Sequence, residues 1–221
     1  AKRGGWSWST SWRILDVGGR KRLESRPLGA SDSRHGTAML RSPLAQNPEH
    51  TLTGFTGAPD TLRAMVRAAL GERGEKSLVV RGLAERITRD LQDKDYLGEI
   101  VAIRHWVSRN VRYLNDPLHV ELIKDPQRLV EEFHAYGRTT ADCDEIACLL
   151  GTLALCIGRV AEYVVAGFGE PGHYSHVFAR VFEPKSGQWI VCDPVAGTGE
   201  RQMLTRITTY QRWSLDEPLA A

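Results

Sequence analysis

TTADCDEIACLLGTLALCIG, residues 139–158, places a cysteine at the start of an apolar helix, and the organisation of the chain follows from this segment. Apolar side chains recur along it at i, i+3, i+4, i+7 and i+11, the spacing of one buried helix face. They are Ile146, Leu149, Leu150, Leu153 and Ile157. Thr140 or Asp142 can cap this helix, and Gly158 is a C-terminal stop. Because a helix N-terminus carries unpaired N–H groups and partial positive charge, it favours the Cys143 thiolate over the thiol.

A free cysteine is more often a small buried hydrophobe than a reactive group. The acidic residues Asp142, Asp144 and Glu145 flank Cys143, however, and such neighbours do not suit a core position. The residues downstream of the helix therefore have to distinguish the two interpretations.

Length and composition describe an ordinary globular protein. The 221 residues are enough for one domain with an appendage, and the hydrophobic and charged fractions of 42% and 25% are typical of soluble proteins. A net charge of +2 indicates neither a nucleic-acid partner nor its absence. No apolar run approaches the roughly 20 residues that span a bilayer. Ser and Thr interrupt the segment from Trp6 to Trp12, so we expect no signal-peptide core there.

Four cysteines in a chain of this length do not form a disulfide framework. No His or Cys spacing resembles a zinc site, so we expect no metal and no other cofactor. These features predict a reduced, cytoplasmic-type protein.

Residues 1–56 differ in composition from the rest of the chain. They carry nine Lys or Arg against four Asp or Glu, and Gly and Pro recur through them. Trp6, Trp8 and Trp12 alternate or nearly alternate with Ser and Thr, which suits either an edge hairpin of the main domain or an arm that grips another subunit. We favour a basic arm, because a segment with so few aliphatic residues cannot form its own core.

The main domain is predicted to span residues 57–221, with a helical part at 59–158 and an antiparallel sheet at 159–195. Helical periodicity and capping residues predict helices near residues 60–70, 77–91, 96–110 and 125–134. Alternating apolar residues predict strands at 160–168, 174–182 and 189–193, and their short connections make them antiparallel neighbours. For the tail, residues 196–221, the sequence pattern predicts no particular structure.

The helix and the strands together can assemble a catalytic triad from Cys143, His176 and Asp193. A thiolate attacks an acyl carbon, an imidazole keeps the thiol ionised and then protonates the leaving amine, and a carboxylate orients the imidazole. His173 is the competing base, in the loop that precedes the second strand. We favour His176, because a strand fixes the direction of a side chain better than a loop does.

Three segments resemble the signatures of the transglutaminase-like cysteine-enzyme superfamily: DCDE at 142–145, SHVF at 175–178 and CDPV at 192–195. The resemblance covers about residues 96–195 and is strongest to versions carried by bacteria and tailed bacteriophages. It implies a papain-like α+β fold, with the Cys-bearing helix packed on an antiparallel sheet. It also implies Cys143 as nucleophile, His176 as base and Asp193 as orienting carboxylate.

Two residues depart from the family pattern: Ala141 stands where Gly is usual, and Phe178 stands where Trp is usual. Neither change removes a reacting group, although both leave the substrate open. For the oxyanion we expect the backbone N–H of Cys143 as one donor and Tyr113 as a candidate for a second.

These features predict a thiol-dependent enzyme that hydrolyses peptide or amide bonds in a protein or peptide substrate. One alternative is a catalytically silent structural or assembly subunit, for example of a phage particle, that binds an assembly partner through residues 1–56. Another is acyl transfer to an amine, which would cross-link proteins. We expect no membrane partner and no nucleic-acid partner, and a location in the bacterial cytoplasm or in a phage particle.

Overall fold

The computed structural model describes residues 11–17, 20–26, 50–52, 58–116, 121–170, 173–196 and 200–215. The chain divides into two compact units, residues 1–45 and 46–221. In the first unit β1 (Ser11–Val17) and β2 (Arg20–Arg26) form an antiparallel hairpin, in which Trp12 pairs with Ser25. Trp6 and Trp8 lie outside the described residues.

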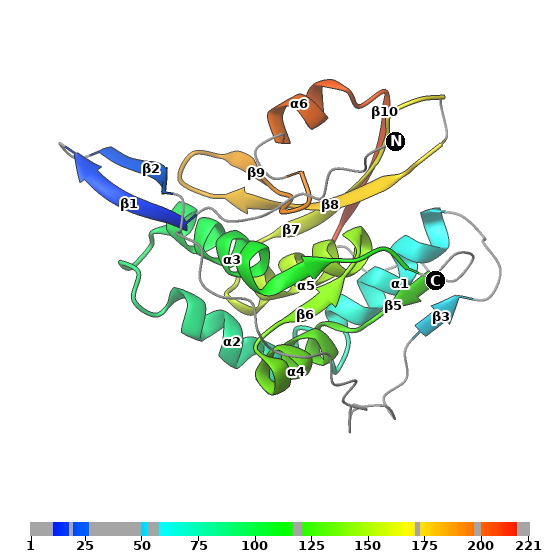
Figure 1. Cartoon of the computed structure of the whole chain (residues 1–221), viewed down its shortest axis with the longest axis horizontal. Helices are drawn as coiled ribbons and strands as arrows, with labels where there is room; N and C mark the ends of the chain where they lie inside the picture. Colours follow the sequence, from blue (N-terminus) through cyan, green and yellow to red (C-terminus); the bar gives the residue numbers. More distant parts are fainter. Residues whose placement is uncertain are drawn as a thin grey trace, which may run out of the picture. The chain divides into compact units, whose positions relative to one another are not determined.

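Four helices pack around a fifth, α5, which carries the cysteine (Figure 1). They are α1 (Ala58–Leu70), α2 (Leu78–Thr88), α3 (Tyr96–Asn110), α4 (Pro126–Tyr136) and α5 (Cys143–Cys156). The four predicted helices are present, and α2 is shorter than expected because it ends at Thr88. Local signals set the ends: Ser77 accepts the N–H groups of Val79 and Val80, and Gly137 closes α4 with a φ of 71°.

α5 is the most deeply buried helix, since eleven consecutive residues, from Asp144 to Ala154, are buried. Its N-cap is Asp142, one of the two predicted caps, and Gly158 follows it with a φ of 72°. Glycine suits that position because left-handed backbone is unfavourable for residues with a Cβ.

A four-stranded antiparallel sheet packs against α5, with strand order β10–β7–β8–β9 (Figure 1). Its strands are β7 (Ala161–Gly167), β8 (His176–Glu183), β9 (Gln188–Cys192) and β10 (Thr209–Ser214). The predicted α+β architecture, a cysteine-bearing helix on an antiparallel sheet, is therefore confirmed.

The tail supplies two elements that the sequence pattern did not assign. One is the edge strand β10, which pairs with β7. The other is α6 (Glu200–Thr205), whose Met203 packs with Ile207 against Val164 and Phe178 on the sheet. Both faces of β7 and β8 are consequently covered.

Four short strands of the second unit pair outside this sheet. β5 (Glu121–Ile123) pairs with β3 (His50–Leu52), so residues 50–52 lie in the second unit although the sequence assigned them to the arm. β6 (Thr139–Ala141) runs parallel to β4 (Val111–Tyr113), and Tyr113 pairs with Ala141. This last pairing brings Tyr113 close to the start of the cysteine helix.

Within the described part of the chain, no helix is long and apolar enough to cross a membrane. All four cysteines are free thiols.

Candidate active site

Cys143 is the first residue of α5 and is half-buried. A reciprocal capping box precedes it: the Asp142 carboxylate accepts the Glu145 N–H at 3.4 Å, and the Glu145 carboxylate accepts the Asp142 N–H at 3.2 Å. The start of α5 is thereby held in one conformation, which orients the thiol and the N–H groups of the first turn.

His176 and Asp193 meet across two neighbouring strands. His176 opens β8, Asp193 follows β9, and His176 Nε2 lies 2.7 Å from Asp193 Oδ2. The other oxygen of Asp193 accepts the N–H groups of Val195 and Ala196 at 3.0 and 3.2 Å. Asp193 is only 1% exposed, and these hydrogen bonds hold its carboxylate against the imidazole.

The charge state of His176 depends on two opposing effects. Burial lowers the pKa of the imidazole, but the hydrogen bonds that the ring donates to Asp193 and Cys143, with the negative charge of both groups, outweigh it and raise the pKa to about 9. The ring is therefore an imidazolium at neutral pH. Since Nε2 is bonded to Asp193, Nδ1 is the ring nitrogen left for the Cys143 thiol.

The structure thus brings Cys143, His176 and Asp193 together. His173, the competing base, is exposed in the loop between β7 and β8, and in the part of the chain that the structure describes it makes no hydrogen bond to Asp193. The rings of Phe168 and Phe178 lie 6.4 and 6.0 Å from the His176 ring, centroid to centroid. Phe178, which stands where the resemblance leads us to expect Trp, is therefore an aromatic neighbour of the imidazole.

Tyr113 also lies close to this group of side chains. Its pKa is raised to about 12 by burial first and then by the negative charge of Cys143, Asp142, Asp193 and Asp116. The phenol consequently stays protonated and can donate a hydrogen bond. Its side chain comes from β4, which the parallel pairing with β6 fixes beside the start of α5.

The other three cysteines occupy unreactive surroundings. Burial raises the pKa of the Cys148 and Cys192 thiols to about 12 and that of Cys156 to about 11. A buried thiol of raised pKa is a poor nucleophile at neutral pH, because the thiolate is the reacting form.

Sequence reasoning missed two residues beside Cys143. The carboxylate of Glu145, which is 1% exposed, accepts the backbone N–H of Lys124 at 2.9 Å. The spacing from Asp142 to Glu145 is that of a capping box and could have identified Glu145. Nothing local in the sequence identifies Lys124, which lies 21 residues before Glu145 in the chain.

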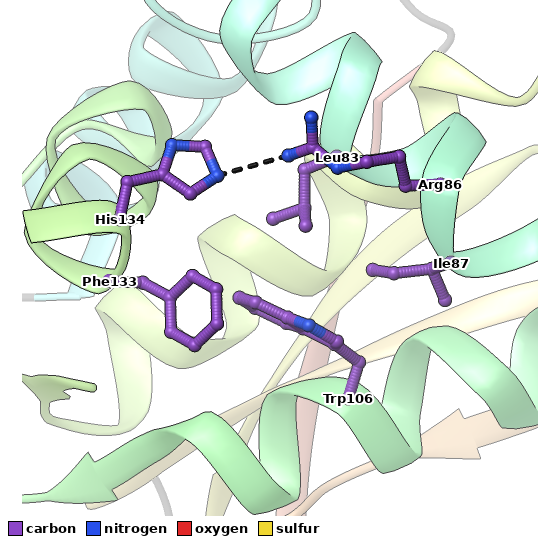
Figure 2. Close-up of a pocket in the computed structure, with 6 residues that line it drawn as sticks. All are labelled: Leu83, Arg86, Ile87, Trp106, Phe133 and His134. Carbon is purple, nitrogen blue, oxygen red and sulfur yellow. Dashed lines mark hydrogen bonds between the residues drawn. The ribbon is translucent and has the colours of Figure 1, made fainter. Parts of the chain in front are cut away.

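A separate surface groove of about 470 Å³ lies between α2, α3 and α4 (Figure 2). Leu83, Ile87, Trp106 and Phe133 form its apolar part, and Arg86 and His134 meet at its edge at 3.0 Å. None of the predicted site residues lines this groove. The Trp106 and Phe133 rings pack edge to face, with centroids 4.7 Å apart, so Trp106 contributes to the packing of this region.

No group of three metal-binding side chains occurs among residues that the structure describes.

The sequence model of the transglutaminase-like superfamily matches residues 81–194, more than half of the chain, including Cys143, His176 and Asp193. The chain therefore belongs to the transglutaminase-like superfamily, as its three signatures predicted. Membership supports a thiol enzyme at the level of the superfamily.

Two solved structures are similar to this chain at low identity. One is a putative cysteine protease from Cytophaga hutchinsonii, with a TM-score of 0.44 and 16% identity over 75% of this chain and 59% of that one. The other is a putative protease from Parabacteroides distasonis, with a TM-score of 0.48 and 12% identity over 95% of this chain and 39% of that one. The chain spans less than two thirds of the length of either protein.

None of the curated protein sequences compared with this chain matches it. The predicted likeness to versions carried by tailed bacteriophages gains no support from these comparisons.

Proposed function

We propose that this protein is a thiol hydrolase that cleaves peptide or amide bonds through an acyl-enzyme. The observation that carries the proposal is the 2.7 Å hydrogen bond between His176 and Asp193, next to the half-buried thiol of Cys143. A structural role alone does not explain why an imidazolium is held between a cysteine and a buried carboxylate.

In the proposed reaction the Cys143 thiolate attacks the carbonyl carbon of the substrate and forms the C–S bond. The carbonyl oxygen becomes an oxyanion, which the Cys143 N–H and the Tyr113 hydroxyl stabilise. The Nδ1–H of His176 then protonates the leaving amine as the C–N bond breaks. Water, deprotonated by Nδ1, releases the acyl group as a carboxylic acid and regenerates the thiolate–imidazolium pair. Asp193 stays ionised throughout and stabilises the imidazolium.

Hydrolysis and acyl transfer share this acyl-enzyme and differ in whether water or an amine resolves it. We place hydrolysis first because water needs no further binding site, whereas transfer needs a channel for an amine.

A peptide library incubated in H₂¹⁸O tests the proposal. We expect ¹⁸O in the new carboxyl group of cleaved peptides and no cleavage by Cys143→Ser. Incorporation of dansylcadaverine into a protein acceptor, without ¹⁸O-labelled products, would show transfer instead. Cleavage that persists in Cys143→Ser, or the absence of both products, would contradict a Cys143 enzyme and favour the silent subunit.

A further inference from the structure

A buried ion pair lies behind the nucleophile. Glu145 Oε2 is 3.9 Å from Lys124 Nζ, and the two side chains are only 2% and 16% exposed. Glu145 Oε1 also accepts the backbone N–H of Lys124 at 2.9 Å. Both the main chain and the side chain of Lys124 therefore face one carboxylate.

This pair connects three segments that are separate in the sequence. Lys124 Nζ donates to the carbonyl oxygen of Thr140 in β6 at 2.7 Å, and Glu145 Oε2 accepts the N–H of Asp142 at 3.2 Å. β6, the N-cap and the first turn of α5 are thus tied to the segment between β5 and α4. Cys143 lies inside the loop that these contacts close.

Stability does not by itself account for such a pair. Burying two charges is unfavourable, and well-packed apolar residues often replace a buried ion pair without loss of stability. Asp142 already caps α5 through the Glu145 N–H. The pair instead adds fixed geometry at the residues on either side of Cys143.

We propose that Glu145 and Lys124 are positioning residues that hold Cys143 and its N–H in the orientation required for attack. This inference rests on the proposed function of Cys143 and deepens it. Neither residue contacts His176 in this proposal; both act through Asp142, Thr140 and the first turn of α5.

The ionisation of Glu145 makes the positioning dependent on pH. Burial raises the pKa of Glu145 to about 7, against the opposing effect of Lys124, while Asp142 raises it further. Glu145 also influences Cys148, a titratable group on the same helix. As the pH falls through about 7, Glu145 loses the charge that attracts Lys124, and the start of α5 loosens.

Stability and reactivity then respond to pH in opposite directions. A carboxyl whose pKa is raised on folding binds its proton more tightly in the folded state, so it contributes more stability below about pH 7 than above it. Cys143 reactivity should fall over the same range. His176 remains an imidazolium there, because its pKa is about 9.

The experiment is iodoacetamide labelling of Cys143 from pH 5.5 to 8.5, read by mass spectrometry, with thermal melting beside it. For the wild type we expect an inflection near pH 7. Glu145→Gln should lose that inflection and label about 10- to 100-fold more slowly at pH 8, the scale for a displaced reacting group. Glu145→Asp, which keeps the charge, should restore the inflection in part.

Two further variants complete the test. Lys124→Met should move the inflection up by about one pH unit or more, since an opposite charge lowers a carboxyl pKa by this scale. Glu183→Gln is the matched control: Glu183 is 4% exposed and accepts the N–H groups of Lys185 and Ser186, but it lies at the end of β8 away from His176. In this control Cys143 should react with iodoacetamide at the same rate and with the same pH dependence as in the wild type.

The outcomes separate the inference from the proposed function. Selective labelling of Cys143 in the wild type, with an unchanged rate and inflection in both Glu145→Gln and Lys124→Met, overturns the positioning pair and leaves the proposed function intact. A wild type in which Cys143 labels no faster than the other three cysteines overturns both.

Discussion

At the scale of single residues, Cys143 differs from the other cysteines in its surroundings. Burial raises the pKa of Cys148, Cys156 and Cys192, whereas Cys143 lies half-exposed beside an imidazolium. We therefore predict that substoichiometric iodoacetamide at pH 7.5 labels Cys143 first. Peptide mapping of the folded protein measures this order, with Cys143→Ser as control. Initial labelling at any other cysteine would contradict the assignment of the nucleophile.

Asp193→Asn should reduce both reactivity and stability. Asparagine lacks the charge that stabilises the His176 imidazolium. In a related serine triad such a change lowers the turnover number by a factor of about 10⁴. A thiolate–imidazolium pair is partly self-sustaining, so we expect alkylation of Cys143 at pH 6–7 to fall by about 10- to 10³-fold, scaled from that case. Because Asp193 is buried, we also expect a loss of about 1–3 kcal/mol in the free energy of unfolding.

Alkylation and thermal melting of the same samples distinguish these two effects. Asp95→Ala provides a control, since Asp95 caps α3 by accepting the Gly98 N–H at 3.1 Å and alanine cannot replace that hydrogen bond. This control should lose stability without losing Cys143 reactivity. Unchanged alkylation in Asp193→Asn would remove Asp193 from the site.

His176 should make the stability of the protein fall at alkaline pH. Its pKa is raised from 6.5 to about 9 on folding, so its contribution is fully present below about pH 6.5 and is lost as the pH rises through 9. We expect the free energy of unfolding of the wild type to exceed that of His176→Gln at pH 6.5, and this difference should be about 1–3 kcal/mol larger than at pH 9.5. Urea denaturation of both proteins at the two pH values measures the difference. A constant difference would show that His176 is not held as an imidazolium.

At the scale of elements, α6 covers an apolar surface of the sheet that the core around α5 does not reach. Met203 is partly buried against this surface, whereas its neighbour Leu204 is exposed. Met203→Asp places a charge in the contact and should lower the free energy of unfolding by about 1–3 kcal/mol. Leu204→Asp should change it by no more than about 0.5 kcal/mol. Equal denaturation midpoints for the two variants would show that α6 does not stabilise the sheet.

At the scale of the whole molecule, the two units predict how the chain tolerates truncation. Deleting residues 1–45 removes the first unit and should leave a cooperatively folding domain. Deleting residues 1–55 also removes β3, which leaves the backbone groups of β5 without their strand partner. We expect a lower melting temperature for the longer deletion. A molten protein after the shorter deletion would show that the arm belongs to the main core.

The same truncation tests the predicted role of the arm in assembly. If residues 1–45 bind another subunit, the full chain should form a larger species than the truncated chain in light scattering. The same number of chains per particle in both proteins, or a larger number after the deletion, would contradict this role.

Local patterns in the sequence determined much of this protein. The apolar face of α5, its cap at Asp142 and its stop at Gly158 depend on residues close together in the chain, and so does the alternation that defines β7, β8 and β9. The order of Cys143, His176 and Asp193 along these elements was enough to predict the superfamily and the candidate site.

Tertiary structure alone decided what depends on distant partners. Strands of three residues, such as β4 and β6, are too short to show a period, and their pairing is what places Tyr113 beside the start of α5. The Glu145–Lys124 pair and the burial of Asp193 likewise arise from contacts across the fold. These contacts set the charge and the rigidity of the site, because burial and neighbouring charges shift a pKa and sequence spacing does not measure either of them.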